Sequence, residues 1–160
     1  MEKTTNKYSY PVLLNRKIKV DYKSSPAHKD KLKYSVDFIC DENTPIKASY
    51  GGVVVDVKQN SGVSGKSKKY DKHGNYIEIK HKNQEYSIYE HIKKKGSTVM
   101  IGEKVKTGQL IGYSGKTGWI AHLGPHLHFG VHKYFGKGPN DYQTLKIKWN
   151  RKVPIKRAGS

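Results

Sequence analysis

The sequence contains a single cysteine, Cys40, in 160 residues. One cysteine excludes an internal disulfide and a zinc site built from several thiolates. No apolar run approaches the roughly 20 residues that a membrane-spanning helix needs, and the first residues lack an apolar segment of signal-peptide length. Any metal site in this chain must therefore be built from histidine and carboxylate side chains.

Acidic residues are also scarce, because 13 Asp and Glu stand against 31 Lys and Arg, for a formal net charge of +18. A field of this sign attracts polyanions such as nucleic acid, anionic lipid surfaces or acidic wall polymers. Lysine-rich surfaces also serve solubility alone. The 12 tyrosines among these lysines leave a nucleic-acid-binding β-barrel as a rival interpretation. The charge thus indicates a class of partner and leaves the reaction open.

Helical periodicity is missing, since no long segment has apolar residues spaced three and four apart. Short β-type runs instead recur between turn residues, at 51–57, 75–81, 85–91, 109–114 and 126–132. This spacing predicts an all-β fold, in which antiparallel sheets form a single compact domain with little helix. Residues 82–84 have the composition of a tight hairpin link, and residues 59–72 that of a long exposed loop.

The chain divides into three segments by composition. Residues 1–24 form an N-terminal segment that offers a candidate edge strand. Residues 25–136 hold the β-type runs and the histidine-rich motifs, and are expected to form the functional domain. Residues 137–160 form a basic C-terminal tail. Neither terminal segment carries obvious chemistry.

Half of the eight histidines fall between residues 122 and 132, at positions 122, 126, 128 and 132. Side chains alternate faces in a strand, so Leu127 and Phe129 should point into a core while His126 and His128 point to the other face. Residues two apart lie about 6.6 Å apart along a strand, which allows one imidazole to bind a metal and its neighbour to act on a bound water. A solvated polar face is the alternative.

Two further elements carry candidate site residues. His91 closes an alternating strand after Tyr89 and Glu90, and it could face the same cleft as the His126–His128 pair. Asp37 lies in a β-like run followed by a turn-rich segment. A structural hydrogen-bonding role for Asp37 is the alternative to metal binding.

Order and spacing of these motifs resemble the lysostaphin-type (LytM-like) peptidoglycan endopeptidases, in register from about residue 28 to residue 132. The quoted stretches are Asp37-Phe38, NTPIKA at 43–48, GNYIEIKH at 74–81, Tyr89-Glu90-His91, VMIGEKVKTGQLIGYSGKTG at 99–118 and GPHLHF at 124–129. The last two are the most specific, and Ile92 replaces the leucine that usually follows the Y-x-H element.

The resemblance implies one zinc ion held by a histidine, Asp37 and His128, with His91 and His126 as the catalytic pair. The best-known members place the first histidine four residues before the aspartate, where this chain has Lys33. Lysine is not a normal zinc ligand at neutral pH. We therefore assign the third ligand to His28, the one histidine upstream of Asp37. Further residues are expected to hold ring tautomers or line the substrate groove: Tyr89, His81, His122 and His132.

The function that the resemblance implies is zinc-dependent hydrolysis of peptide cross-links or stem peptides in bacterial cell-wall peptidoglycan. The expected partners are peptidoglycan peptides and anionic wall polymers, with no specific nucleic acid, and the chain is expected to be a monomer. Such an enzyme works in an extracellular, periplasmic or wall-associated location. The alternative is a catalytically degenerate domain of the same type that acts as a binding or activator module.

Overall fold

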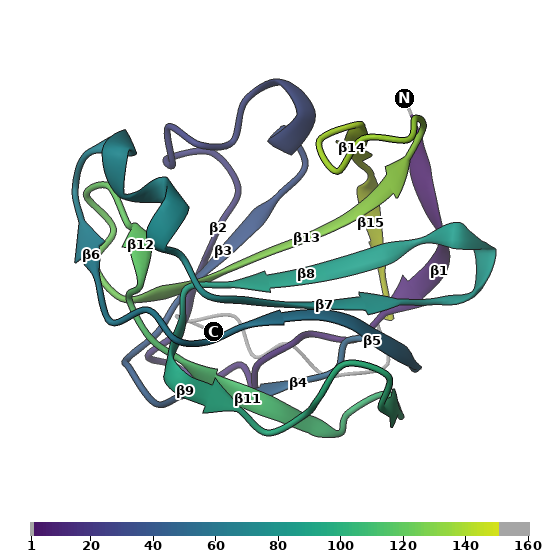
Figure 1. The fold of residues 1–160 in the computed structure, drawn as a ribbon, viewed down its shortest axis with the longest axis horizontal. Helices are drawn as coiled ribbons and strands as arrows, with labels where there is room; N and C mark the ends of the chain where they lie inside the picture. The colour runs from purple at the N-terminus through teal and green to yellow at the C-terminus, as the bar shows by residue number, and fades with distance from the viewer. Residues whose placement is uncertain (1, 151–160) are drawn as a thin grey trace.

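The runs of β-branched and aromatic residues form strands in the computed structural model, which describes residues 2–150 (Figure 1). The largest sheet has eight strands, all in antiparallel pairs, in the order β10-β5-β7-β8-β13-β3-β2, with β14 also paired to β13. Their bounds are β2 Lys19–Asp21, β3 Val36–Ile39, β5 Gly52–Lys58, β7 Tyr76–Lys80, β8 Tyr86–Glu90, β10 Lys104–Val105, β13 His126–Tyr134 and β14 Tyr142–Thr144.

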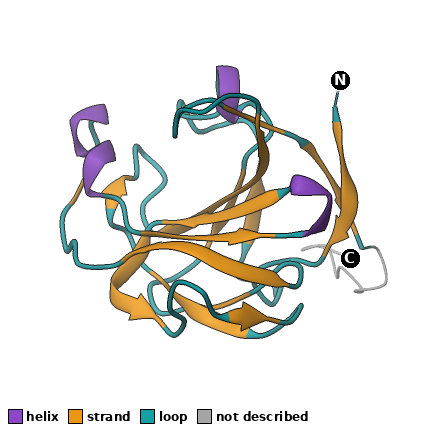
Figure 2. Ribbon diagram, turned by 45° about the vertical axis from the view of Figure 1, so that its right-hand side comes forward, coloured by secondary structure: helices purple, strands orange, loops and turns teal. Residues whose placement is uncertain are grey.

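Three smaller sheets complete the described part of the chain. An antiparallel sheet has the order β4-β11-β9, with bounds β4 Pro45–Lys47, β9 Ile92–Ser97 and β11 Leu110–Ser114. Two parallel pairs join β1 Lys3–Tyr8 to β15 Lys146–Trp149, and β6 Ser64–Gly65 to β12 Gly118–Trp119. Helix is limited to short 3₁₀ turns at Asp30–Leu32, Lys68–His73 and Lys82–Gln84 (Figure 2). The all-β prediction is confirmed, and the two parallel pairs add to the antiparallel sheets that it named.

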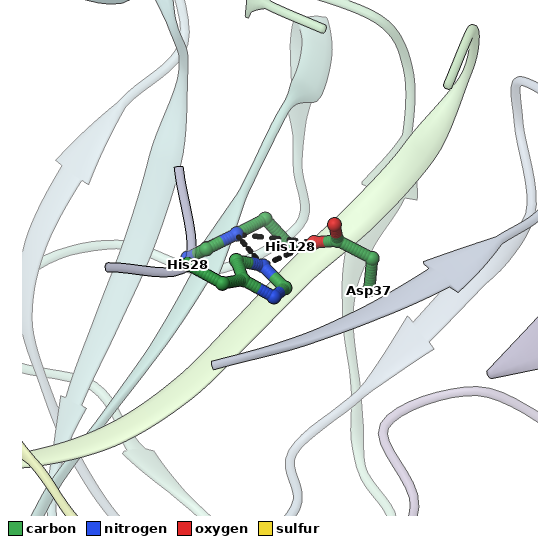
Figure 3. A group of neighbouring side chains, drawn as sticks. All are labelled: His28, Asp37 and His128. Atoms are coloured by element: carbon green, nitrogen blue, oxygen red, sulfur yellow. Dashed lines mark hydrogen bonds and ion pairs between the residues drawn. The ribbon is translucent and has the colours of Figure 1, made fainter. Parts of the chain in front are cut away.

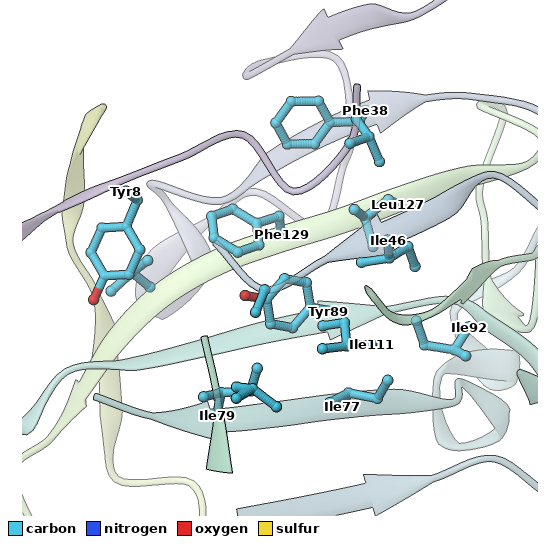
Figure 4. Close-up of a cluster of buried hydrophobic side chains, with 14 of the residues drawn as sticks. Tyr8, Phe38, Ile46, Ile77, Ile79, Tyr89, Ile92, Ile111, Leu127 and Phe129 are labelled. Carbon is cyan, nitrogen blue, oxygen red and sulfur yellow. The ribbon is translucent and has the colours of Figure 1, made fainter. Parts of the chain in front are cut away.

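The hydrophobic core lies between the large sheet and the three-stranded sheet (Figure 4). Ile46, Ile92 and Ile111 come from the smaller sheet and are fully buried against residues of β7, β8 and β13. In β13 the alternation is the predicted one, because Leu127 and Phe129 have no exposed surface and enter this core. Burial of each such side chain stabilises the fold by about 1.5–3 kcal/mol.

The link between β7 and β8 is the predicted hairpin turn. Asn83 and Gln84 have φ angles of 62° and 55°, so the chain reverses through left-handed conformations within the Lys82–Gln84 turn. Asparagine tolerates this region better than most residues. The predicted long loop at 59–72 is partly ordered, since it contains β6 and most of the Lys68–His73 turn.

The two terminal segments lie side by side, as Figure 1 shows for β1 and β15. The Glu85 carboxylate accepts hydrogen bonds from the Thr5 and Asn6 backbone amides, at 2.8 and 2.9 Å, and fastens β1 to the β7–β8 hairpin. The segment expected to be a basic tail contributes β14 and β15 to the folded structure. Residues 151–160 of that segment lie outside the described residues. No helix in the described part of the chain is long and apolar enough to span a membrane.

A buried polar network around His81 crosses the large sheet. His81 Nδ1 lies 2.9 Å from the Gly51 carbonyl, so Nδ1 must donate and Nε2 must accept from the Ser87 hydroxyl at 2.7 Å. Ser87 Oγ lies 3.0 Å from the Tyr89 hydroxyl, which also accepts from the Ser49 amide. Burial of the ring lowers the pKa of His81 to about 4, and the bond to Gly51 opposes this shift. His81 is therefore neutral in the folded protein at pH 7.

The lowered pKa of His81 predicts a pH-dependent stability. Between about pH 6.5 and pH 4 the unfolded chain binds a proton at His81 that the folded chain does not, so the free energy of unfolding falls as pH falls. His81→Gln should remove about 2 kcal/mol of the decrease between pH 7.5 and pH 5, in denaturant unfolding at both pH values. The exposed His122→Gln variant is the control. Equal pH dependence in all three proteins would contradict this prediction.

Candidate metal centre

Strand register places Asp37 and His128 next to each other. In the antiparallel pair of β3 and β13, Asp37 and His128 are Cα partners, so their side chains leave the sheet on the same face. His128 Nδ1 lies 3.1 Å from Asp37 Oδ1. Both side chains are buried, at 3% and 0% exposed. The face opposite the core is thus also covered.

His28 reaches the same point from the loop between β2 and the Asp30–Leu32 turn. Its Nδ1 lies 3.1 Å from the Tyr22 carbonyl, which directs Nε2 toward the other two residues. His28 Nε2 is 3.2 Å from Asp37 Oδ1 and 3.3 Å from His128 Nδ1. Lys33, four residues before Asp37, is exposed and has its ammonium 5.6 Å from the centre of the Tyr34 ring.

The three atoms His28 Nε2, Asp37 Oδ1 and His128 Nδ1 form a triangle with sides of 3.1 to 3.3 Å (Figure 3). Hydrogen bonds alone do not account for this triangle, since each ring nitrogen has at most one hydrogen and it points in one direction. Zinc ligands at 2.0–2.1 Å in tetrahedral geometry lie about 3.3 Å apart. Asp37 Oδ2 is buried and has no hydrogen-bond partner within residues 2–150. The donor set and its spacing fit a zinc ion.

Among the described residues this is the one group of three or more histidine, cysteine or acidic side chains whose ligand atoms converge within 4.8 Å. It contains the three residues expected from the sequence to hold zinc. Its electrostatics also suit a cation. Burial by itself would raise the pKa of Asp37, but the hydrogen bonds from His128 and His28 outweigh burial and hold this pKa well below its usual range. The carboxylate is therefore ionised at any working pH.

His91 and His126 lie beside this group with their rings 4.4 Å apart, centre to centre. His126 Nδ1 lies 2.8 Å from the Gly124 carbonyl, and His91 Nδ1 lies 2.7 Å from the Thr117 carbonyl. A carbonyl only accepts, so each Nδ1 carries the hydrogen and each Nε2 keeps its lone pair. His126 Nε2 is 3.8 Å from Asp37 Oδ1. The expected catalytic pair is thus brought to the candidate metal centre.

Both imidazoles of this pair are neutral at pH 7. Burial, with the neighbouring His128, lowers the pKa of His91 to about 4. Burial, with the neighbouring His91, lowers the pKa of His126 to about 4. His128 behaves differently: burial favours its neutral form, but Glu90 and Asp37 outweigh burial and raise its pKa to about 9.

A left-handed backbone conformation at His91 turns its own side chain toward the site. Strand alternation alone would put His91 on the same face as Tyr89, which has no exposed surface and packs in the core. His91 instead has φ of 67° between the end of β8 and the start of β9. This conformation is uncommon for a residue with a Cβ and is found where the surrounding structure enforces it. Here the His91 amide donates to the Asn75 carbonyl and its ring nitrogen to Thr117.

Three groups at this site carried no sequence signal. Glu90 Oε2 lies 3.5 Å from His128 Nε2, which has no hydrogen-bond partner among the described residues. The carbonyls of Thr117 and Gly124 fix the tautomers of His91 and His126. A backbone carbonyl has no sequence signature, and Glu90 faces the site because of the pairing of β8 with β13, in which Glu90 is opposite His128.

The four residues expected around the site are not all near it. His81 and Tyr89 belong to the buried network that includes Ser49 and Ser87, and make no contact with the metal-binding group. His132 lies farther along β13, with Nε2 3.2 Å from Glu78 Oε1. His122 is exposed in the segment before β13. Their roles as outer-sphere or groove residues stay predictions.

Comparison with known proteins identifies the family of this chain. Residues 31–142 match the family described as "Peptidase family M23". This chain belongs to peptidase family M23. The family match begins after His28, so the place of His28 in the centre rests on the distances given above.

Known proteins and solved structures each match part of the chain. It is 36% identical over 99 residues to the peptidoglycan DD-endopeptidase ShyC of Vibrio cholerae, which is 62% of this chain and 20% of that protein. A zinc-containing peptidase from Vibrio cholerae matches 79% of this chain and 36% of its own, with 25% identity and a TM-score of 0.56. Lysostaphin from Staphylococcus simulans matches 81% of this chain and 48% of its own, with 28% identity and a TM-score of 0.56. The chain thus spans about a fifth of the length of ShyC.

The triangle of ligand atoms predicts one zinc ion per chain. We expect elemental analysis of purified protein to find about one zinc, and His28→Ala to lose it, because two ligands would remain. The loss of affinity should exceed the roughly 10- to 100-fold that outer-sphere changes cost. His122→Ala, which removes an exposed histidine, should keep its zinc. Retention of zinc by His28→Ala at wild-type affinity would contradict the assignment.

Proposed function

We propose that this chain is a zinc-dependent endopeptidase that hydrolyses peptide cross-links or stem peptides of bacterial peptidoglycan. The observation that carries the proposal is the convergence of the His28, Asp37 and His128 ligand atoms beside a neutral histidine pair. Membership of peptidase family M23 and the likeness to a peptidoglycan DD-endopeptidase support the same substrate class. The spacing of these groups suits metal-assisted hydrolysis of an amide bond.

In this proposal His28, Asp37 and His128 hold the ion through Nε2, Oδ1 and Nδ1. When bound, zinc supplies a Lewis acid that polarises the scissile carbonyl and lowers the pKa of a water molecule toward neutrality. Three protein ligands leave a coordination position for substrate or water. The Tyr22 carbonyl holds the ring of His28 in place, and Glu90 stands beside the outer nitrogen of His128.

His126 is the proposed general base. Its Nδ1 is committed to the Gly124 carbonyl, so the lone pair on Nε2 is presented toward the metal-binding group. Its lowered pKa keeps Nε2 unprotonated at pH 7, which a base requires. No glutamate of the H-E-x-x-H type is present in the sequence, so proton handling falls to histidine.

His91 is the proposed partner for the developing negative charge. Its Nδ1 donates to Thr117, which leaves Nε2 as an acceptor in the neutral ring. His91 can therefore stabilise an oxyanion only after Nε2 has taken up a proton, which His126, with its ring centre 4.4 Å away, would pass on after taking it from water. The two histidines thus act as one proton-holding unit in this mechanism.

Location and further partners follow from the same proposal. Peptidoglycan lies outside the cytoplasmic membrane, so the proposed activity belongs to an extracellular, periplasmic or wall-associated protein. A net charge of +18 favours contact with anionic wall polymers. We propose that the chain acts as a monomer, because one chain supplies the complete set of five residues.

The roles of His126 and His91 predict a separation of metal binding from turnover. His126→Ala and His91→Ala should each lower the rate of release of peptide fragments from purified peptidoglycan by about 100-fold or more while about one zinc per chain is retained. Lys104→Ala, at an exposed position of β10 four strands away from β13, should hydrolyse like the wild type. Loss of zinc from either alanine variant would reverse the division between ligands and catalytic residues.

Chelation separates the proposed enzyme from a binding module of the same fold. Removal of zinc should stop hydrolysis of purified peptidoglycan, and added zinc should restore it, with mass spectrometry of the released fragments identifying the bond that is cut. Binding of peptidoglycan without hydrolysis in the zinc-loaded protein would instead favour the binding or activator module.

A further inference from the structure

A cavity of about 280 Å³ lies against the large sheet next to the candidate metal centre. His128 lines it, and so does His132, four residues farther along β13. Four residues in a strand span about 13 Å. The lining therefore runs along β13, from the candidate metal ligand His128, for about the length of a peptide segment of three or four residues.

The charge of this cavity is opposite to that of the chain. Asp56, Glu78 and Glu90 line it, whereas no Lys or Arg of the described residues does, in a chain with 31 such residues. The Lys31 ammonium, from a residue outside the lining, lies 4.4 Å over the ring of Tyr142. The Lys31 ammonium thus already lies against one face of Tyr142, a residue that lines the cavity.

Two of the carboxylates are arranged unfavourably for stability. Asp56 and Glu78 are Cα partners in the antiparallel pair of β5 and β7, and both side chains line the cavity. Like charges directly opposite each other destabilise a sheet. A bound cation would offset this repulsion.

Hydrogen bonds within the cavity leave oxygens available to a ligand. Glu78 Oε1 accepts from the Tyr134 hydroxyl at 2.7 Å and lies 3.2 Å from His132 Nε2, and Asp56 Oδ2 accepts from the Tyr76 hydroxyl at 2.8 Å. The second oxygen of each carboxylate takes no hydrogen bond from a described residue. His132 is 2% exposed, and its Nδ1 is buried without a partner in the described structure.

The carboxylates also help to raise the pKa values of two tyrosines that line the cavity, Tyr142 and Tyr76. Burial, followed by the charges of Glu90, Asp71 and Glu78, raises the pKa of Tyr142 to about 12. For Tyr76, burial and the Asp56 carboxylate raise the pKa to about 12. Tyrosine rings and carboxylates together are the groups that recognise an ammonium ion in proteins.

We propose that this cavity binds a protonated primary amine of the peptide substrate, within about four residues of the bond that is cut. An ammonium group offers three hydrogen-bond donors to Asp56 and Glu78 and a positive charge to the tyrosine faces. Asp56, Glu78 and Glu90 do not form a metal site. Among the described residues, the one group whose ligand atoms converge as metal ligands would is that of His28, Asp37 and His128. The proposal rests on the proposed function for its placement relative to the scissile bond.

The test measures binding of two matched probes. The first is alanyl-lysyl-alanine with both ends blocked, so that the lysine ammonium is its sole charge, and the second is the same peptide with that amine acetylated. Titration of zinc-loaded protein by NMR should give a dissociation constant at least about tenfold lower for the amine, with shifts at Tyr134 and Tyr142. Mass spectrometry of the probe checks that it stays intact.

Matched variants locate the effect in the cavity. Asp56→Asn and Glu78→Gln should each remove most of the preference for the amine while the acetylated probe binds as before. Glu42→Gln removes one exposed acidic charge outside the cavity and should keep the preference. Asp56 is partly exposed, so Asp56→Asn still tests the proposal where Glu78→Gln fails to fold.

Equal dissociation constants for the two probes would overturn the subsite, and so would an equal loss in Glu42→Gln and Asp56→Asn. Hydrolysis of peptidoglycan before and after acetylation of its free amines separates this failure from failure of the enzyme. Hydrolysis that acetylation leaves unchanged would overturn the subsite and keep the proposed function. Selective binding of the amine probe without any hydrolysis would keep the subsite and overturn the proposed function.

Discussion

The pairing of β13 with β3 on one side and β8 on the other is the constraint on which the site depends. It sets Asp37, His128 and Glu90 in one row across the sheet, since His128 is the Cα partner of both other residues. A shift of one residue in either pair would send Asp37 or Glu90 to the core face. The core residues Leu127 and Phe129, on the opposite face of β13, make such a shift costly.

Burial on both faces of β13 gives the centre its chemical character. The core covers one face, and the loop that carries His28 helps to cover the other, so His126 and His128 are 2% and 3% exposed. Low solvent access lowers the pKa of His91 and His126, while nearby carboxylates raise the pKa of His128. The same carboxylates favour a cation at the centre, where a metal bound at His128 Nδ1 would displace that ring's proton, whereas the neutral rings of His91 and His126 suit proton transfer.

Two sets of buried polar groups on the large sheet differ in whether their hydrogen bonds are satisfied. The His81 network satisfies its hydrogen bonds internally with Gly51 and Ser87, as a structural network does. Near β13, by contrast, three buried atoms accept or donate no hydrogen bond in the described part of the chain: Asp37 Oδ2, His128 Nε2 and His132 Nδ1. Unsatisfied buried atoms are costly and concentrate where a ligand is bound. Both the proposed metal centre and the proposed amine subsite lie on this part of the sheet.

The sequence by itself determined the all-β fold, the β7–β8 hairpin and the two faces of β13, because apolar alternation and turn residues are local signals. It also singled out Asp37, His126 and His128 through their motifs. Only the tertiary structure decided that His28 meets Asp37, because a loop's path depends on what it packs against. The same holds for His91, which leaves the alternation of β8 through a left-handed φ that tertiary hydrogen bonds enforce. Glu90, Asp56 and Glu78 became neighbours of a cavity through strand register, which no short stretch of sequence encodes.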